Sequence, residues 1–260
     1  MQSREPLPGG ADRLSPRYEG VPRSTRLTRL GGRLLAAIDR LVARTSRYGD
    51  VPIFDNAQFP WANEIEDAWP AIRAELDTVM LRHNELPNFQ DLTPEVGNIN
   101  CDNQWKTYFF YGYGIRCDAN CQRCPETTRM LARIPGMKTA FFSILAPGKQ
   151  IPAHTGPYKG VLRYHLGLIV PEPKERCRIR VADQIRHWEE GRSLIFDDTF
   201  EHEVWNETTG LRAVLFVDFA RPCRFPGNLV NRLFLAIAGW LPQLRRAKRN
   251  YERWEAVFYH

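Results

Sequence analysis

The fold of this 260-residue chain can be predicted from one segment, Val161-Leu162-Arg163-Tyr164-His165-Leu166-Gly167-Leu168-Ile169. Side chains in an extended strand point alternately to its two faces. Arg163 and His165 therefore share one face with Gly167, and the apolar and aromatic residues between them share the other. An arginine and a histidine that are buried together need an anionic ligand or a metal beside them. The segment thus predicts a strand of a β core with a functional site on one face.

Further strands follow Gly136 at short intervals, separated by turns that contain glycine. The expected strands are 138–145, 161–170, 177–181, 193–196, 201–205 and 211–219. In the last of these, Arg212 falls on one face with Val214 and Phe216, and a buried arginine again calls for a buried acid. Several short strands at this spacing predict a sandwich or barrel and not a parallel sheet.

Helices are expected outside this β region. In residues 24–47, leucines and Ile38 recur at steps of three and four residues with arginines between them, which is typical of a basic amphipathic helix. Two more helices are expected at 62–82 and 126–134. The chain thus divides into four regions. They are a disordered basic N-terminus over 1–22, a helical N-terminal extension over 23–100, a β domain over 101–222 and a basic amphipathic tail over 223–260.

The net charge of +6 is concentrated at the two ends of the chain. Basic ends suggest an anionic partner surface, either phospholipid or nucleic acid. No motif with aromatic residues between basic ones supports nucleic acid, so no nucleic-acid partner is expected. The N-terminus lacks the layout of a secretory signal peptide, and no apolar run approaches the roughly 20 residues that span a bilayer. We therefore expect a cytoplasmic protein, with peripheral attachment to the inner face of the cytoplasmic membrane as one role for the basic ends.

Three of the six cysteines, Cys117, Cys121 and Cys124, lie close together in the sequence. They resemble part of a zinc site, but no fourth ligand stands at a metal-binding spacing. A structural turn with free thiols is the favoured interpretation.

Two histidines and one arginine carry the chemistry. His154 follows an expected strand, His202 opens another about fifty residues later, and Arg212 follows about ten residues after that. Imidazoles suit Fe(II) with open coordination positions, and the planar guanidinium pairs bidentately with a carboxylate such as that of 2-oxoglutarate. The order is that of non-haem iron oxygenases. Each histidine alone is more often a core or surface residue than a ligand, and the usual carboxylate two residues after the first histidine is replaced by Gly156.

Several longer strings resemble the aspartyl/asparaginyl β-hydroxylase family. They are His154-Thr155-Gly156-Pro157, Arg163 to Leu168, Trp188-Glu189-Glu190-Gly191 and Ile195 to Trp205. The resemblance covers roughly residues 100–222. It implies a mainly β fold, the double-stranded β-helix (jelly roll, cupin-like), with N-terminal and C-terminal helical extensions. It also implies an Fe(II)- and 2-oxoglutarate-dependent dioxygenase that uses O2, and peptide-hydroxylating members of the family share the glycine.

The resemblance assigns roles to particular residues. It implies that His154 and His202 are the iron ligands, and that Arg212 and Ser143 hold one end of 2-oxoglutarate. The other positions that it implies for the co-substrate pocket are Arg163, His165 and Trp105. Adjacent strand residues face opposite ways. Asp197 and Asp198 are therefore expected to support the site or a turn rather than to replace the missing carboxylate.

The substrate is predicted from a closer likeness to one branch. Phe54-Asp55-Asn56 and the segment Trp105 to Gly114 resemble bacterial relatives that hydroxylate acyl chains of lipid A and ornithine lipids. We therefore expect an aliphatic C–H of a membrane-lipid acyl chain as the substrate, with the terminal helices either binding an anionic membrane or packing on the barrel. The alternatives are β-hydroxylation of Asp or Asn in peptides or of a small amino-acid metabolite, and a non-enzymatic binding protein.

Overall fold

A computed structural model of the chain describes residues 26–93, 101–112, 114–238 and 242–258. The helices are α1 Arg26–Thr45, η1 Asn56–Gln58, α2 Trp61–Asp67, α3 Trp69–Met80, η2 His83–Glu85, α4 Phe89–Leu92, α5 Asp118–Arg123, α6 Pro125–Leu131, η4 Lys174–Arg176, α7 Gly227–Ala238 and α8 Pro242–Phe258. The strands are β1 Ile53–Phe54, β2 Trp105–Gly112, β3 Ile115–Arg116, β4 Met137–Leu145, β5 Gln150–His154, β6 Val161–Ile169, β7 Cys177–Val181, β8 Gln184–His187, β9 Ser193–Phe196, β10 His202–Asn206 and β11 Arg212–Ala220.

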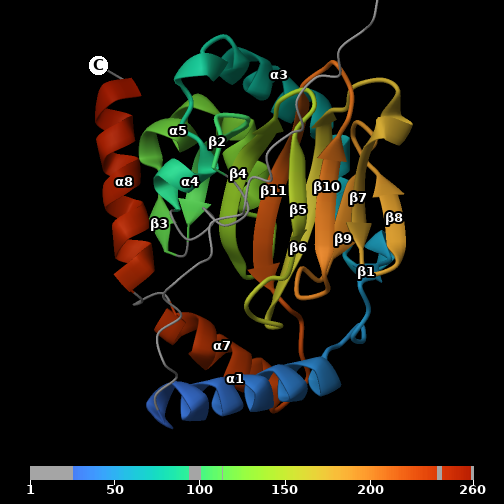
Figure 1. Ribbon diagram of the computed structural model, residues 1–260, viewed down its shortest axis with the longest axis vertical. Coiled ribbons are helices and arrows are strands. Elements are labelled where there is room, and N and C mark those ends of the chain that lie inside the picture. Colours follow the sequence, from blue (N-terminus) through green and yellow to red (C-terminus); the bar gives the residue numbers. More distant parts are fainter. Residues whose placement is uncertain (1–25, 94–100, 113, 239–241, 259–260) are drawn as a thin grey trace, which may run out of the picture.

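The strands form two antiparallel sheets that pack face to face (Figure 1). The larger sheet has seven strands in the order β1-β9-β6-β11-β4-β2-β3, and the smaller has four in the order β5-β10-β7-β8. From β4 to β11 the chain passes back and forth between the two sheets, and only β7 and β8 follow each other within one sheet. This is the winding of a double-stranded β-helix. The predicted fold is confirmed: a mainly β jelly roll with helices at both ends.

The central strands β6 and β11 separate two cores. Their side chains alternate between an inner core shared with the smaller sheet and an outer core shared with the helices. Val214 and Phe216 lie in the inner core, and His165 contacts Phe216 there with 5.1 Å between ring centroids. Leu166 and Leu215 lie in the outer core. Both faces of these strands are therefore buried, as their long apolar runs predict, and the predicted face of Arg163 and His165 is the inner one.

The helices α2 and α3 cover the outer face of the larger sheet, with Ile65, Ile72 and Leu76 in the outer core. The sequence predicted one helix over 62–82, and this was wrong. The helix ends at Asp67 and a new one begins at Trp69, with Pro70 in its first turn. Proline has no N–H to donate and its ring clashes with the preceding turn, so one continuous helix cannot pass through it.

The terminal helices lie at the edges of the barrel. The amphipathic helix expected over 24–47 is α1, which packs beside α7 across one end of the barrel (Figure 1). Among the residues that the structure describes, no helix has both the length and the apolarity needed to cross a membrane. Residues 1–22, expected to be disordered, lie outside the described residues, as do the side chains of the basic cluster at Arg245 and Arg246.

The three neighbouring cysteines surround α5. Cys117, Cys121 and Cys124 are all free thiols and all buried. Burial raises the pKa of the Cys117 thiol to about 12. The three cysteines therefore pack as free thiols, as the favoured interpretation held, but on and beside a short helix and not around a turn.

Candidate active site

The two predicted metal histidines meet across a pair of strands in the smaller sheet. His154, the last residue of β5, lies directly opposite His202, the first residue of β10. Their ring centroids are 4.1 Å apart. Residues about fifty positions apart in the sequence are thus brought together by strand register.

Each ring is held by a hydrogen bond to the backbone two residues earlier. Nδ1 of His154 lies 2.8 Å from the carbonyl oxygen of Pro152, and Nδ1 of His202 lies 3.0 Å from that of Phe200. A carbonyl only accepts, so Nδ1 carries the proton and Nε2 keeps its lone pair, as in metal-binding histidines. Burial lowers the pKa of His154, and burial lowers the pKa of His202 to about 3. Both rings are therefore neutral, the form that binds a metal.

A carboxylate occupies the space beside the glycine that replaces the third ligand. A Cβ placed on Gly156 would lie 2.3 Å from Cγ of Asp198, and the Gly156 N–H donates to the carbonyl of Asp198 at 2.7 Å. Within the described ranges no third His, Cys, Asp or Glu completes a metal cluster with the histidine pair. Among the described residues, His154 and His202 are therefore candidate metal ligands without a third such side chain beside them.

Asp198 belongs to a buried network beside the histidines. Its carboxylate pairs with Nη2 of Arg163 at 2.9 Å, and Nε of Arg163 pairs with Asp218 at 2.9 Å. The guanidinium also lies 4.3 Å above the ring of Phe216. Burial raises the pKa of Asp198 to about 6, against the opposing effect of Arg163. Asp198 therefore lies in a turn and pairs with Arg163, and its support of a functional site stays a prediction.

At the other side of the inner core, Arg212 is a buried cation without an acid. Its Nε and Nη1 atoms are buried and make no hydrogen bond to any residue that the structure describes. Its guanidinium lies 4.6 Å over the Trp188 ring, and burial lowers its pKa to about 10. Leaving a buried charge unpaired costs several kcal/mol. The arrangement fits a small ligand whose carboxylate pairs with this fork.

His165 lies between Arg212 and the metal histidines. Trp188 Nε1 donates to His165 Nδ1 at 3.4 Å, and the His165 Nε2 is buried and has no hydrogen-bond partner within the described ranges. Because an indole N–H only donates, Nδ1 must be the acceptor and the proton lies on Nε2. Burial lowers the pKa of His165 well below its usual value, so the ring is neutral. It therefore presents an unused N–H donor toward the same ligand.

Ser143 and Trp105 line the same inner core. Trp105 Nε1 donates to the Ser143 hydroxyl at 3.0 Å, and both side chains are buried. Ser143 lies on β4 opposite Val214, and the next pair along the ladder on that face is Arg212 with Leu145. The structure thus gathers every residue predicted for the site around the inner core. Two residues of the site were not predicted from the sequence. Trp188 was given no role, although its motif was recognised. Asp218 was also given none, and it lies opposite Arg163 in the β6–β11 register.

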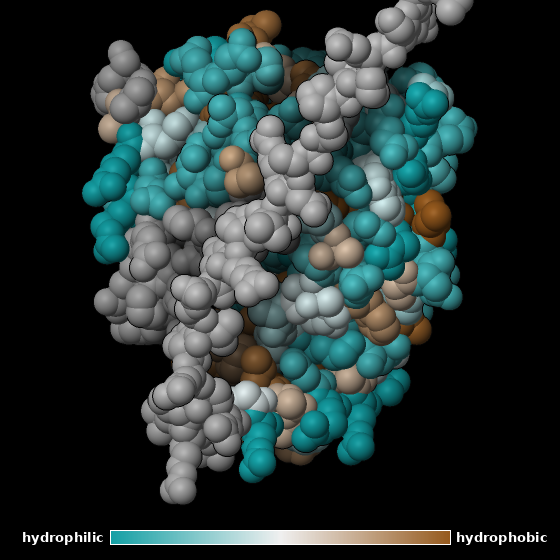
Figure 2. Space-filling view, in the orientation of Figure 1, coloured by the Kyte–Doolittle hydropathy of each residue, from teal (hydrophilic) through white to brown (hydrophobic). Residues whose placement is uncertain are grey.

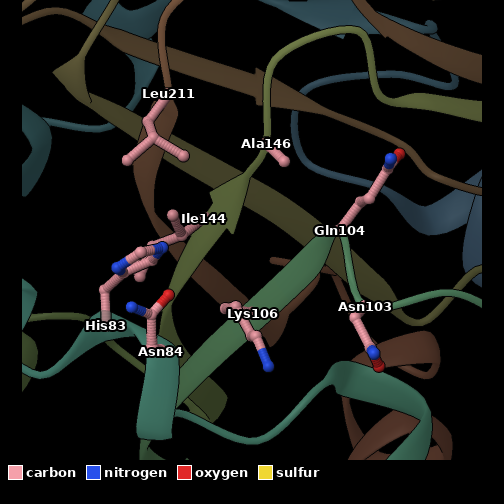
Figure 3. Close-up of a pocket in the computed structure, with 8 residues that line it drawn as sticks. All are labelled: His83, Asn84, Asn103, Gln104, Lys106, Ile144, Ala146 and Leu211. Atoms are coloured by element: carbon pink, nitrogen blue, oxygen red, sulfur yellow. The ribbon is translucent and has the colours of Figure 1, made fainter.

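Two cavities lie away from the histidine pair. One of about 280 Å³ is lined by polar side chains including His83, Asn103 and Lys106 and holds none of the predicted site residues (Figure 3). Its wall includes Ile144, which belongs to the outer core. A larger one of about 600 Å³ is open between β1 and β8 and is lined in part by Trp188. Trp188 therefore contacts Arg212 on one side and an open cavity on the other.

Comparison with known proteins places the chain among hydroxylases. The sequence pattern of the Aspartyl/Asparaginyl beta-hydroxylase family matches residues 66–222. The chain is 47% identical over 239 residues to the Ornithine lipid ester-linked acyl 2-hydroxylase of Rhizobium tropici, covering 92% of this chain and 85% of that protein. It is 37% identical over 163 residues to the Aspartyl/asparaginyl beta-hydroxylase of Homo sapiens, covering 61% of this chain and 21% of the human protein.

Among solved structures, a Pseudomonas putida prolyl-4-hydroxylase is similar with a TM-score of 0.41 and 16% identity, covering 59% of this chain and 88% of that one. The cupin domain of Schizosaccharomyces pombe Cnp3 is similar with a TM-score of 0.34 and 10% identity, covering 54% and 77%. The family match spans more than half of the chain and includes every candidate site residue. The chain therefore belongs to the Aspartyl/Asparaginyl beta-hydroxylase family, a family of hydroxylases.

Proposed function

We propose that this protein is an Fe(II)- and 2-oxoglutarate-dependent dioxygenase that hydroxylates an aliphatic C–H on the acyl chain of a membrane lipid of the ornithine-lipid type. The observation that supports the cofactor is the pairing of two features in one core. Two neutral histidines present Nε2 at one end, and the unpaired Arg212 guanidinium lies at the other. Neither the histidine pair nor the buried arginine stabilises the fold by itself. Together they fit a bound metal and a dicarboxylate.

His154 and His202 would hold the iron, and the glycine between β5 and β6 would keep one position open. Asp198 fills the space at Gly156, where a third protein ligand would start. The backbone bonds to Nδ1 fix both rings, so that metal binding requires little reorganisation. A neutral pair adds no charge to the metal, which leaves a cationic centre for an anionic co-substrate.

Arg212 would pair with the far carboxylate of 2-oxoglutarate through its Nε and Nη1 donors, with the Ser143 hydroxyl beside it. The Nε2–H of His165 would donate to an oxygen of the same molecule. Phe196 and Phe216 are both buried against His165 and would exclude water from the space between the histidine pair and Arg212. When bound, iron and 2-oxoglutarate supply the oxidising chemistry: one atom of O2 enters the substrate C–H and the other enters succinate as CO2 is lost.

The substrate class rests on similarity along the chain. The Rhizobium tropici relative, named as an ornithine lipid acyl 2-hydroxylase, matches 92% of this chain. That match extends well beyond the barrel, whereas the human relative matches 61%. Elements outside the barrel are therefore shared with the lipid-modifying protein, and these parts would contact a substrate too large for the barrel.

The test is turnover of purified, Fe(II)-loaded protein with 2-oxoglutarate, O2 and detergent-dispersed ornithine lipid. We expect succinate and a lipid product heavier by one oxygen on an acyl chain, with both absent for His202→Ala and on omission of iron. Succinate formed without any change in the lipid would keep the dioxygenase and reject the substrate. Failure to bind both iron and 2-oxoglutarate would reject the dioxygenase.

A second candidate is β-hydroxylation of Asp or Asn in peptides or of a small amino-acid metabolite. It is favoured by the 37% identity to the human protein. The same assay with Asp- and Asn-containing peptides in place of lipid decides between the two.

A further inference from the structure

The platform formed by α1 and α7 has one side on the barrel and one side in solvent. On α7, Asn231 and Leu235 are buried, while Leu229, Leu233 and Ile237 lie on the opposite side of the helix and are each 60% exposed. These three residues, called the α7 ridge below, recur every four residues and so form one continuous apolar stripe. Phe225, just before α7, is 77% exposed. Such a row of large exposed apolar side chains marks an interaction surface.

Arginines are exposed on α1, the helix that packs beside α7. Arg33, Arg40 and Arg44 are exposed on the side of α1 that faces away from the buried Val42. Three further exposed arginines lie close by in the sequence of the two helices: Arg47, Arg224 and Arg232. The segments 26–47 and 223–238 contain a single acid, Asp39, whose carboxylate accepts from the backbone N–H of Lys159 at 3.0 Å. The platform is therefore apolar along one helix and cationic along the other, with six exposed arginines against one acid in these two segments.

The platform is also bonded to the loop that follows the first metal histidine. In that loop, Tyr158 donates to Asn231 Oδ1 at 2.9 Å and its ring lies 4.2 Å from that of Phe234. Tyr158 further packs in a small core with Leu35 and Leu235, one from each helix. Figure 1 shows this loop at the end of the barrel next to α7. The platform thus lies at the same end of the molecule as the histidine pair.

We propose that the outer face of the α1–α7 platform docks on the surface of an anionic lipid bilayer, with the α7 ridge in the interface and the arginines of α1 against lipid phosphates. Apolar burial and attraction to anionic lipid together are what hold interfacial helices on membranes. The space-filling view shows hydrophobic and hydrophilic side chains side by side at this end of the molecule (Figure 2). Docking in this way turns the histidine end of the barrel toward the acyl chains, a consequence that rests on the proposed function.

A second copy of the chain fits this face poorly. A two-fold dimer through the platform brings like surfaces together, so the arginines of both copies would meet without an acid between them. A bilayer containing phosphatidylglycerol supplies the negative charge that the platform lacks. Charge complementarity therefore selects the membrane.

The test is flotation of the full-length protein with vesicles of phosphatidylcholine, with and without phosphatidylglycerol. We expect binding that requires phosphatidylglycerol and falls as salt is raised, because salt screens exposed charges. Leu229→Ser/Leu233→Ser/Ile237→Ser should reduce partitioning by roughly tenfold or more, since apolar area entering the interface is lost. Arg33→Glu/Arg40→Glu/Arg44→Glu should do the same at low salt. All six side chains are exposed, and circular dichroism checks that the variants fold.

Matched controls use exposed apolar residues elsewhere. Leu81 and Ile185 are 84% and 50% exposed and lie away from the platform. Leu81→Ser/Ile185→Ser should leave vesicle binding unchanged. Binding that is absent from all vesicles, or equal for the ridge variant and the control variant, would overturn the inference. A concentration-dependent dimer abolished by the ridge variant, with no vesicle binding, would overturn it in favour of a second copy.

Docking and catalysis fail in distinguishable ways. The ridge variant should keep turnover on detergent-dispersed ornithine lipid and lose it on the same lipid in vesicles. Vesicle binding without lipid hydroxylation in either form would retain the docking surface and reject the proposed substrate. Hydroxylation in detergent by a protein that never binds vesicles would retain the substrate and reject the docking surface.

Discussion

At the scale of single residues, Arg212 gives the strongest support for a bound acid, since its buried Nε and Nη1 have no partner in the part of the chain that the structure describes. Arg212→Met should abolish 2-oxoglutarate binding, and Arg212→Lys should recover little of it because an ammonium lacks the planar fork. In the ligand-free protein, Arg212→Met should raise the free energy of unfolding by about 1–3 kcal/mol, because an uncompensated buried charge is removed. Urea unfolding and calorimetric titration measure both. A large loss of stability would show that Arg212 is a structural residue.

Gly156 yields a second prediction at this scale. A Cβ there would meet the Asp198 carboxylate at 2.3 Å, so Gly156→Ala should lower the free energy of unfolding by about 1–3 kcal/mol and weaken metal binding. Gly156→Ala/Asp198→Gly should recover part of the stability, because the clashing group is gone. Unfolding of the two variants under identical conditions checks this. Equal stability of Gly156→Ala and the parent protein would contradict the packing described.

The sequence predicted side-chain placement correctly where strand alternation alone determines the face to which a side chain points. The shared face of Arg163 and His165 follows from the two-residue period of a strand, whichever strands lie beside it. The contact of Arg163 with Asp218 does not, because it depends on the register of β6 with β11. Trp188 was missed for the same reason, since its contact with Arg212 joins a loop to a strand far away in the sequence.

At the scale of elements, the turn between β9 and β10 is held by a buried ion pair. Asp197 pairs with Arg221 and with Lys159 at 3.2 Å, and the side chains of Asp197 and Arg221 are both fully buried. Asp197→Asn should lower the free energy of unfolding by about 3–5 kcal/mol, because it leaves a buried cation unpaired. Asp50→Asn removes the other, more exposed partner of Lys159 and should cost less than about 1 kcal/mol. Chemical denaturation compares the two, and equal effects would contradict the assignment.

The elements that the sequence predicted are those with a strong hydrophobic period. The six strands predicted after Gly136 all form within a residue or so of their expected bounds, because each has apolar residues on a buried face. The strand β5 was not predicted: of its five residues only Ile151 is buried, and Pro152 interrupts the pattern. It forms because it pairs with β10. That pairing also brings the two candidate metal ligands together, so the sequence predicted the two histidines but not the contact between them.

At the scale of the whole molecule, buried neutral histidines make stability depend on pH. Burial places the pKa of His154, His165 and His202 below the usual 6.5. The unfolded chain therefore binds more protons than the folded one below pH 6.5, and the free energy of unfolding falls as pH falls through that range. Each such histidine contributes up to about 1.4 kcal/mol per pH unit.

Thermal unfolding of the metal-free protein between pH 8 and pH 5 measures this slope, in a range set by the ordinary histidine pKa. His165→Asn should make stability depend less steeply on pH than in the parent protein. The reason is that the folded and unfolded chains then differ in proton binding at one histidine fewer. A slope that is equal in the parent and His165→Asn would contradict a neutral buried His165.

The fold class of the whole molecule could be read from its strands and motifs, whereas the orientation of the terminal helices could not. Amphipathic patterns of α1 and α7 fit equally well a helix that packs on the barrel and a helix that lies on a membrane. The structure shows that α7 has a buried side and an exposed apolar side. Only tertiary packing distinguishes the apolar residues that face the barrel from those that face outward.

The most direct measurement is calorimetric titration of 2-oxoglutarate into the protein under anaerobic conditions, with redox-silent Mn(II) in place of Fe(II). If His154 and His202 hold the metal and Arg212 anchors the keto acid, binding will require Mn(II), disappear in His202→Ala and weaken at least about a hundredfold in Arg212→Met. Binding of 2-oxoglutarate that is independent of the metal, or unchanged in both variants, would contradict the site.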